Sequence, residues 1–119
     1  MSLITQDVAG GSTETLSTNM ISFLLRDGLL AWIETTAASR ALKVATTSAV
    51  STLSILNSSV LHATDGGFVV YGESGKTYSW SPSTGPRLLL DTAPNKVIIS
   101  GSTAYFVVGA SAAVYRVGL

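Results

Sequence analysis

The stretch Asp65–Tyr71, with the sequence DGGFVVY, carries the pattern that decides the fold. Two glycines follow an aspartate there, and glycine readily adopts the positive backbone φ that a tight hairpin turn requires. The four residues after the turn are β-branched or aromatic, which is typical of a short strand. The stretch therefore predicts a hairpin tip and the strand that leaves it.

The same pattern of tip and strand recurs on both sides of this stretch. Asp27–Gly28 precedes the apolar run Leu29–Ile33, and Gly101–Ser102 precedes Ala104–Val108. No segment holds the apolar spacing of a core helix over ten or so residues. The chain is therefore predicted to consist of strands and turns, with essentially no helix.

Three leucines upstream of the tips follow the same period. Leu16, Leu53 and Leu89 are 37 and then 36 residues apart. A unit of this length holds four short strands, which is the size of a propeller blade. Runs such as Val97–Ile99 are apolar on both faces, as expected of a sheet packed between two others. The sequence predicts an all-β fold of about three four-stranded antiparallel, blade-like repeats of 36–38 residues, a partial or half β-propeller, with a β-sandwich as the alternative.

The period also divides the chain. Residues 1–12 are expected to be an N-terminal tail or cloning remnant, and residues 13–119 a single β-repeat domain. The predicted repeats cover residues 13–49, 50–85 and 86–119, so that Thr13–Leu16 is the first strand of the first repeat.

Composition excludes several classes of function. Seven basic and seven acidic side chains give a net charge of zero, without the basic patch of a nucleic-acid binder. No polybasic or unbroken apolar segment indicates membrane binding or insertion. The chain has no cysteine and one histidine, so no metal site and no cofactor are predicted.

Catalytic residues are not predicted either. His62 is the only histidine, and no nucleophile elbow accompanies it. Asp27 and Asp65 occupy equivalent positions before glycine, which places them on the same rim of the fold and gives each a turn role. A paired-carboxylate site would need both to face one cleft. The chain is therefore predicted not to be an enzyme.

Four residues remain as candidates for ligand contact. Trp80 is followed closely by Pro82 and is the aromatic residue least expected to be buried. Tyr71 offers an aromatic face with a polar edge, the combination that stacks on sugar rings. Asp27 and Asp65 add carboxylates on the predicted rim.

The stretch Lys76–Gly85, KTYSWSPSTG, resembles the last strand and exit turn of a WD-type blade, where an aromatic pair precedes a Thr-Gly turn. Ser81 stands where that family has aspartate, and the upstream Gly-His dipeptide is missing. The resemblance is to the wider class of bacterial β-propeller repeats. It implies a binding or scaffolding role and no particular chemistry.

Three hypotheses of function follow. The first is a non-enzymatic binding or scaffold module, with a protein or glycan ligand, from a bacterial surface, secreted or periplasmic protein, although residues 1–12 do not read as a signal peptide. The second is a purely structural domain or spacer within a larger protein, and the third an enzyme domain. For assembly, a homodimer that completes a six-bladed propeller and a small self-contained β domain both stay open.

Overall fold

The computed structural model describes residues 2–6, 13–46 and 49–119, and every statement about structure refers to them. These residues form thirteen strands in four antiparallel sheets and contain no helix, which confirms the all-β prediction. The strands are β1 Leu3–Gln6, β2 Thr13–Ser17, β3 Met20–Arg26, β4 Leu29–Thr35, β5 Arg40–Ala45, β6 Val50–Ser54, β7 Val60–Asp65, β8 Phe68–Glu73, β9 Lys76–Trp80, β10 Arg87–Leu90, β11 Lys96–Ser100, β12 Thr103–Val108 and β13 Ala113–Gly118.

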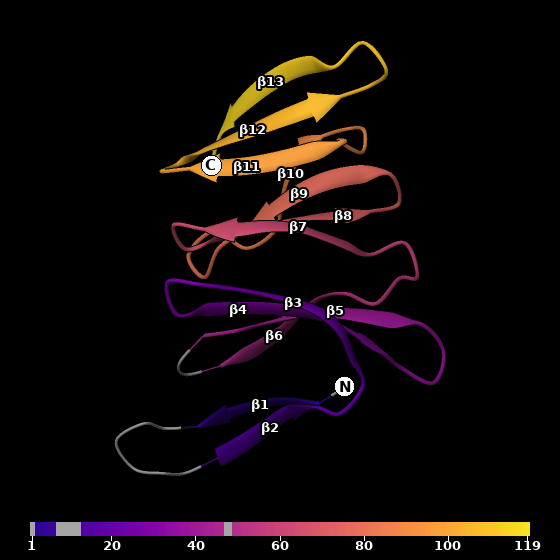
Figure 1. Ribbon diagram of the computed structural model, residues 1–119, viewed down its shortest axis with the longest axis vertical. Helices are drawn as coiled ribbons and strands as arrows, with labels where there is room; N and C mark the ends of the chain where they lie inside the picture. Colours follow the sequence, from indigo (N-terminus) through magenta and orange to yellow (C-terminus); the bar gives the residue numbers. More distant parts are fainter. Residues whose placement is uncertain (1, 7–12, 47–48) are drawn as a thin grey trace.

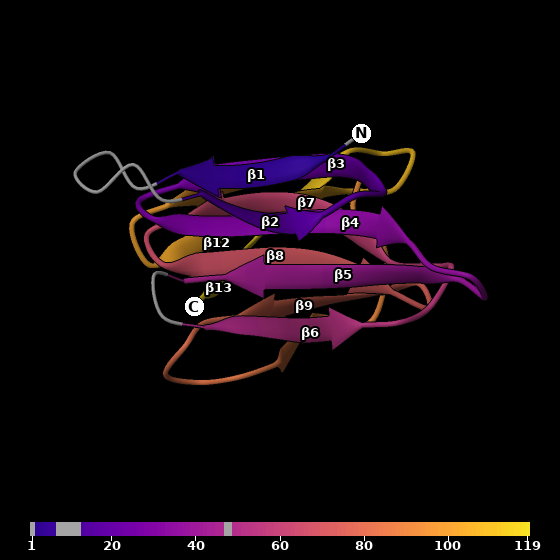
Figure 2. The same cartoon turned by 90° about the horizontal axis from the view of Figure 1, so that it is seen from below.

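The four sheets lie one on another along the longest axis of a molecule that measures 49 × 34 × 21 Å (Figure 1). The first sheet contains β1 and β2, the second β3–β6, the third β7–β10 and the fourth β11–β13. Inside each sheet, strands that are consecutive in sequence are neighbours. The first strands of the second, third and fourth sheets are β3, β7 and β11, which we call the leading strands. They lie side by side along the stack, because β7 contacts both β3 and β11, and Figure 2 shows β3 and β7 on the same side.

Two-residue turns join the first two strands of the second, third and fourth sheets, as predicted. Asp27 and Gly28 have φ of 51° and 76°, and Gly66 and Gly67 have φ of 59° and 85°. Two positive φ values in succession define the turn whose twist matches an antiparallel hairpin. Gly101 has a φ of 61° at the third tip. The three tips lie at the same end of their sheets.

The sheets begin one strand later than the predicted repeats. Thr13–Ser17 pairs with β1 and not with β3, so the four-stranded unit runs from β3 to β6. The reason lies in the segment that follows β2. The Ser17 hydroxyl accepts the N–H of Asn19 (3.3 Å), and the Asn19 carbonyl accepts the N–H of Thr35 (3.0 Å), which carries the chain to the next sheet. The Ser54 hydroxyl accepts the N–H of Leu56 (3.4 Å) at the equivalent place after β6.

The N-terminal segment also differs from its prediction. Residues Leu3–Gln6, expected to belong to a tail, form strand β1 and pair with β2. Leu3 and Leu16 then pack against the buried cluster of Met20, Leu30 and Trp32. Apolar burial by the hairpin explains why the segment is a strand. Residues 7–12, the rest of the predicted tail, lie outside the described residues.

One large aromatic side chain fills the same place in three sheets. Trp32, Tyr71 and Phe106 each lie four residues after the last residue of a hairpin tip, and they are 0%, 2% and 0% exposed. Each lies in the cluster that joins its sheet to the preceding one along the chain. We call these three rings the aromatic ladder. Burial of each ring removes a large apolar area from water, so the aromatic ladder contributes much of the free energy that holds the sheets together.

Candidate functional site

Two of the four candidate contact residues belong to the core. Trp80 is 9% exposed and Tyr71 2% exposed, and both pack in the cluster between the second and third sheets. The expectation that Trp80 is exposed is therefore wrong, because its strand lies in a sheet covered on that face. Tyr71 stacks on Tyr78 with ring centroids 5.5 Å apart. Burial, and then the carboxylate of Glu73, raise the pKa of Tyr71 to about 12.

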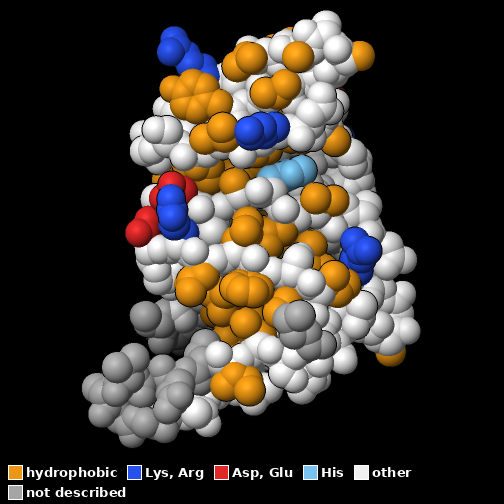
Figure 3. Space-filling view, viewed as in Figure 1, with side chains coloured by type: hydrophobic (Ala, Val, Ile, Leu, Met, Phe, Trp, Pro, Cys, Tyr) orange, Lys and Arg blue, Asp and Glu red, His pale blue; other side chains and the backbone are white. Residues whose placement is uncertain are grey.

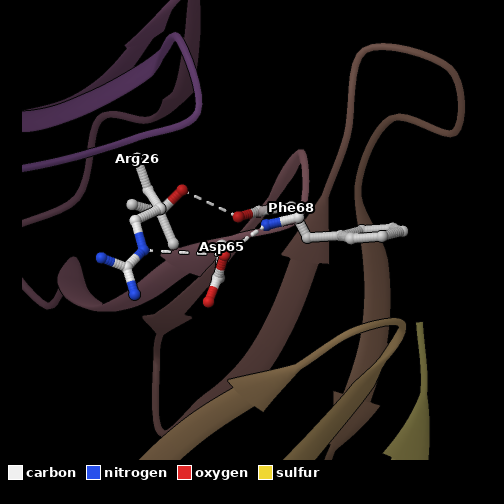
Figure 4. A network of polar contacts seen from close by, with 5 residues as sticks. Arg26, Asp65 and Phe68 are labelled. Carbon is white, nitrogen blue, oxygen red and sulfur yellow. Dashed lines mark hydrogen bonds and ion pairs between the residues drawn. The ribbon is translucent and has the colours of Figure 1, made fainter.

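The two aspartates lie on the side of the stack where the hairpin tips of the sheets are. A carboxylate oxygen of Asp65 lies 3.7 Å from Nε of Arg26, the residue before Asp27, so the second and third sheets are joined there by an ion pair (Figure 4). The same oxygen accepts the N–H of Gly66 at 2.8 Å. Asp65 is therefore held by the turn and by Arg26.

A shallow cavity of about 260 Å³ lies beside this ion pair. It is surrounded by residues from four connections: the tips of the second and third sheets, the β5–β6 loop and the β9–β10 loop. Its lining residues are Asp27, Gly28, Leu29, Thr46, Gly67 and Pro82. We call this place the turn-rim cavity.

The turn-rim cavity combines one carboxylate with apolar surface. Asp27 is exposed in its turn and Pro82 provides exposed carbon surface, whereas Leu29 is only 4% exposed. A carboxylate accepts hydrogen bonds from hydroxyl groups, and small-molecule sites typically combine apolar walls with a few polar groups. The cavity therefore suits a small hydroxylated group. Asp27 was predicted as a site residue, whereas Thr46 and Pro82 were missed because the sequence does not show which loops of adjacent sheets meet.

A second distinctive surface is the side of the stack formed by the leading strands. Apolar side chains gather there in Figure 3. The members that are about half or more exposed come from β3, β7 and β11: Ile21, Phe23, Leu25, Val60 and Ile98. This apolar side belongs to strands whose outer edges carry no partner strand among the described residues.

The histidine lies apart from the turn-rim cavity. His62 is half-buried in β7, and burial lowers its pKa below the usual 6.5. Within the described part of the chain, no three His, Cys, Asp or Glu side chains gather as a metal site would require. Asp27 and Asp65 share the rim, but only Asp27 lines the cavity. Among the described residues, the lining of this cavity therefore lacks the pair of carboxylates that a glycosidase uses.

Comparisons with other proteins add no relative: no protein-family model, curated protein or solved structure matches this chain. In the ranges 2–6, 13–46 and 49–119 there is no helical segment with the length and hydropathy to span a membrane.

Proposed function

We propose that this chain is a non-enzymatic binding module in which blade-like sheets, arranged as in part of a β-propeller, present a ligand site at the turn-rim cavity. The observation that supports it best is the meeting of connections from two adjacent sheets around about 260 Å³ of open space. Binding residues commonly lie on loops that a rigid scaffold positions. The stacked sheets would be that scaffold.

The ligand proposed for the turn-rim cavity is one residue of a glycan. A sugar ring offers hydroxyl groups to the Asp27 carboxylate and a C–H face to Pro82. The cavity is smaller than a typical small-molecule site, so it fits one ring and not a long chain. A glycan ligand agrees with the proposed origin in a surface, secreted or periplasmic protein of a bacterium.

The test is a glycan array followed by titration calorimetry of the strongest ligand with a matched pair of variants. Asp27→Asn removes the charge and keeps the turn, because asparagine followed by glycine is a favoured sequence for this hairpin. Loss of a charge-assisted hydrogen bond of about 1.5–3 kcal/mol would weaken binding roughly tenfold or more.

The control is Asp91→Asn, which removes the same charge from a side chain that is 81% exposed and pairs with Lys76 away from the cavity. We expect Asp91→Asn to bind as the wild type does. Equal affinity of the Asp27→Asn variant, or no glycan bound by the wild type, would contradict the proposed site.

A purely structural scaffold is the second candidate. Burial of Trp80 and Tyr71 supports it, because neither ring is available as a stacking platform for a ligand. A scaffold of this kind would act through the faces at the ends of its stack. An enzyme domain is tested by thermal-shift screening with metals and small acids. Neither the binding module nor the scaffold should be stabilised by them.

A further inference from the structure

The outer face of the fourth sheet is apolar, and no sheet formed by residues 2–6, 13–46 and 49–119 covers it. Ile98 and Tyr105 are cross-strand partners, as are Val107 and Val114, and partners in register project from the same face. The opposite face carries Ile99, Ala104 and Phe106, which pack against the third sheet. Ile98, Tyr105 and Val114 are 52%, 39% and 70% exposed. We call these residues, with Val107, the outer patch.

Equivalent positions in the other sheets are covered. Ala31, Val70 and Tyr105 are each the third residue after a hairpin tip. Ala31 and Val70 are 0% exposed because the next sheet packs on them, whereas Tyr105 is 39% exposed. The outer patch is therefore equivalent to the faces of the second and third sheets on which the next sheet packs.

The opposite end of the stack carries the matching kind of face. Phe23 pairs with Trp32, and one row of partners crosses the second sheet as Leu25, Leu30, Ala45 and Val50. The first sheet packs Leu3 and Leu16 on this face but covers only part of it (Figure 2). Phe23, Leu25 and Val50 remain 50%, 62% and 50% exposed. We call these three residues the leading patch.

Charge also differs between the two ends. The fourth sheet carries Lys96 and Arg116 beside the outer patch and has no acidic residue in its strands. The described strands of the first sheet carry Glu14 and no basic residue. The second sheet, which bears the leading patch, carries both signs of charge: Glu34 and the basic residues Arg26, Arg40 and Lys43. The fit of the two apolar patches, and not charge, therefore carries their association.

We infer that a second copy of this chain packs its outer patch on the leading patch of the first. The contact repeats the interfaces that already join the second, third and fourth sheets, in which the face with the aromatic ladder meets the preceding sheet. A head-to-tail contact of this type closes into a ring when the rotation allows it. A closed dimer would then give each copy one buried outer patch and one buried leading patch. The inference uses the ends of the stack and does not depend on the ligand of the turn-rim cavity.

Sedimentation velocity and light scattering test it with variants at well-exposed positions. We expect the wild type to have about twice the 12.3 kDa mass of one chain. Val114→Lys in the outer patch and Leu25→Glu in the leading patch should each give a folded monomer. A mixture of these two variants should recover the dimer, because one of its two interfaces joins lysine to glutamate and the other is unaltered. Ile55→Lys, at a loop position that is 68% exposed, is the matched control and should stay dimeric.

Several results would overturn the inference: a monomeric wild type at the highest concentration reached, a dimeric Leu25→Glu variant, or a mixture of variants that stays monomeric. Ile98→Lys replaces Val114→Lys if circular dichroism shows that the latter is unfolded. Glycan titration of the Leu25→Glu monomer separates the two proposals, since the turn-rim cavity belongs to one chain and should keep its affinity.

Discussion

The imidazole of His62 packs against the backbone of Gly72 in the neighbouring strand: a Cβ atom on Gly72 would lie 3.0 Å from Nε2 of His62. The register of β7 and β8 shifts between Leu61 and Ala63, where His62 is the additional residue. We predict that Gly72→Ala lowers the free energy of unfolding by about 1–3 kcal/mol, because the extra methyl group displaces the ring. Urea denaturation measures the change.

The double variant shows whether the ring is the obstacle. In a His62→Ala background the same methyl group meets only ordinary contacts, at 3.5 Å from the Lys76 carbonyl and 3.7 Å from Val60. We expect Gly72→Ala to cost much less in that background. An equal cost in both backgrounds would assign the effect to the backbone of β8 instead.

Acid should destabilise the protein through the same histidine. Burial lowers the pKa of His62 below 6.5, so the folded state holds the ring neutral where the unfolded chain already binds a proton. The stabilisation is complete above pH 6.5 and is lost as the pH falls from there through the lower pKa of the folded state. Melting temperatures of the wild type should fall more steeply over this window than those of His62→Gln. Parallel curves would exclude the contribution of His62.

Alkali should act through Tyr71. Its pKa is raised to about 12, chiefly by burial, while the unfolded chain ionises near 10.0. Stability is therefore complete below pH 10.0 and declines as the pH rises from 10.0 to about 12. Tyr71→Phe keeps the stacked ring and removes the ionisation. Unfolding followed by circular dichroism should begin at a higher pH in this variant than in the wild type.

Two neighbouring aromatic residues should respond very differently to truncation. Phe106 is 0% exposed and belongs to the aromatic ladder, so Phe106→Ala should cost about 3–5 kcal/mol of stability. Tyr105 is 39% exposed on the outer patch, so Tyr105→Ala should cost far less in the stability of a single chain. Thermal denaturation at low concentration, where association is weak, compares the two. Similar losses of stability in the two variants would contradict the assignment of Phe106 to the buried face of β12 and Tyr105 to its exposed face.

The ion pair that joins the second and third sheets should contribute little. Arg26 and Asp65 side chains are 63% and 33% exposed, and pairs of this kind are worth about 0–1 kcal/mol. Arg26→Ala should therefore lower the free energy of unfolding by less than about 1 kcal/mol. High salt should abolish this difference between the variant and the wild type. Asp65→Ala should cost more, because it also removes the acceptor for the N–H of Gly66. Urea denaturation, in which the denaturant is uncharged, measures both effects at two salt concentrations.

Local chemistry explains why much of the fold is predictable from the sequence. A two-residue turn needs positive φ, and the pattern of Asp27–Gly28 and Asp65–Tyr71 shows where that is available. Strands on either side of such a turn pair antiparallel, so the tips and their hairpins follow directly. The period is also kept in the structure: Leu16, Leu53 and Leu89 are the second-last residues of β2, β6 and β10, and all three are half-buried.

The sequence by itself determined the strands, the tips and the period, because turn geometry and β-propensity act between residues close along the chain. Only the tertiary structure decided which sheet each strand joins, since the residues 17–19 give no local sign that they cross to another sheet. It also decided that Trp80 is buried and that Pro82 lies beside Asp27, because both depend on contacts between different sheets. Burial is a property of what lies opposite a side chain, and that neighbour comes from a distant part of the sequence.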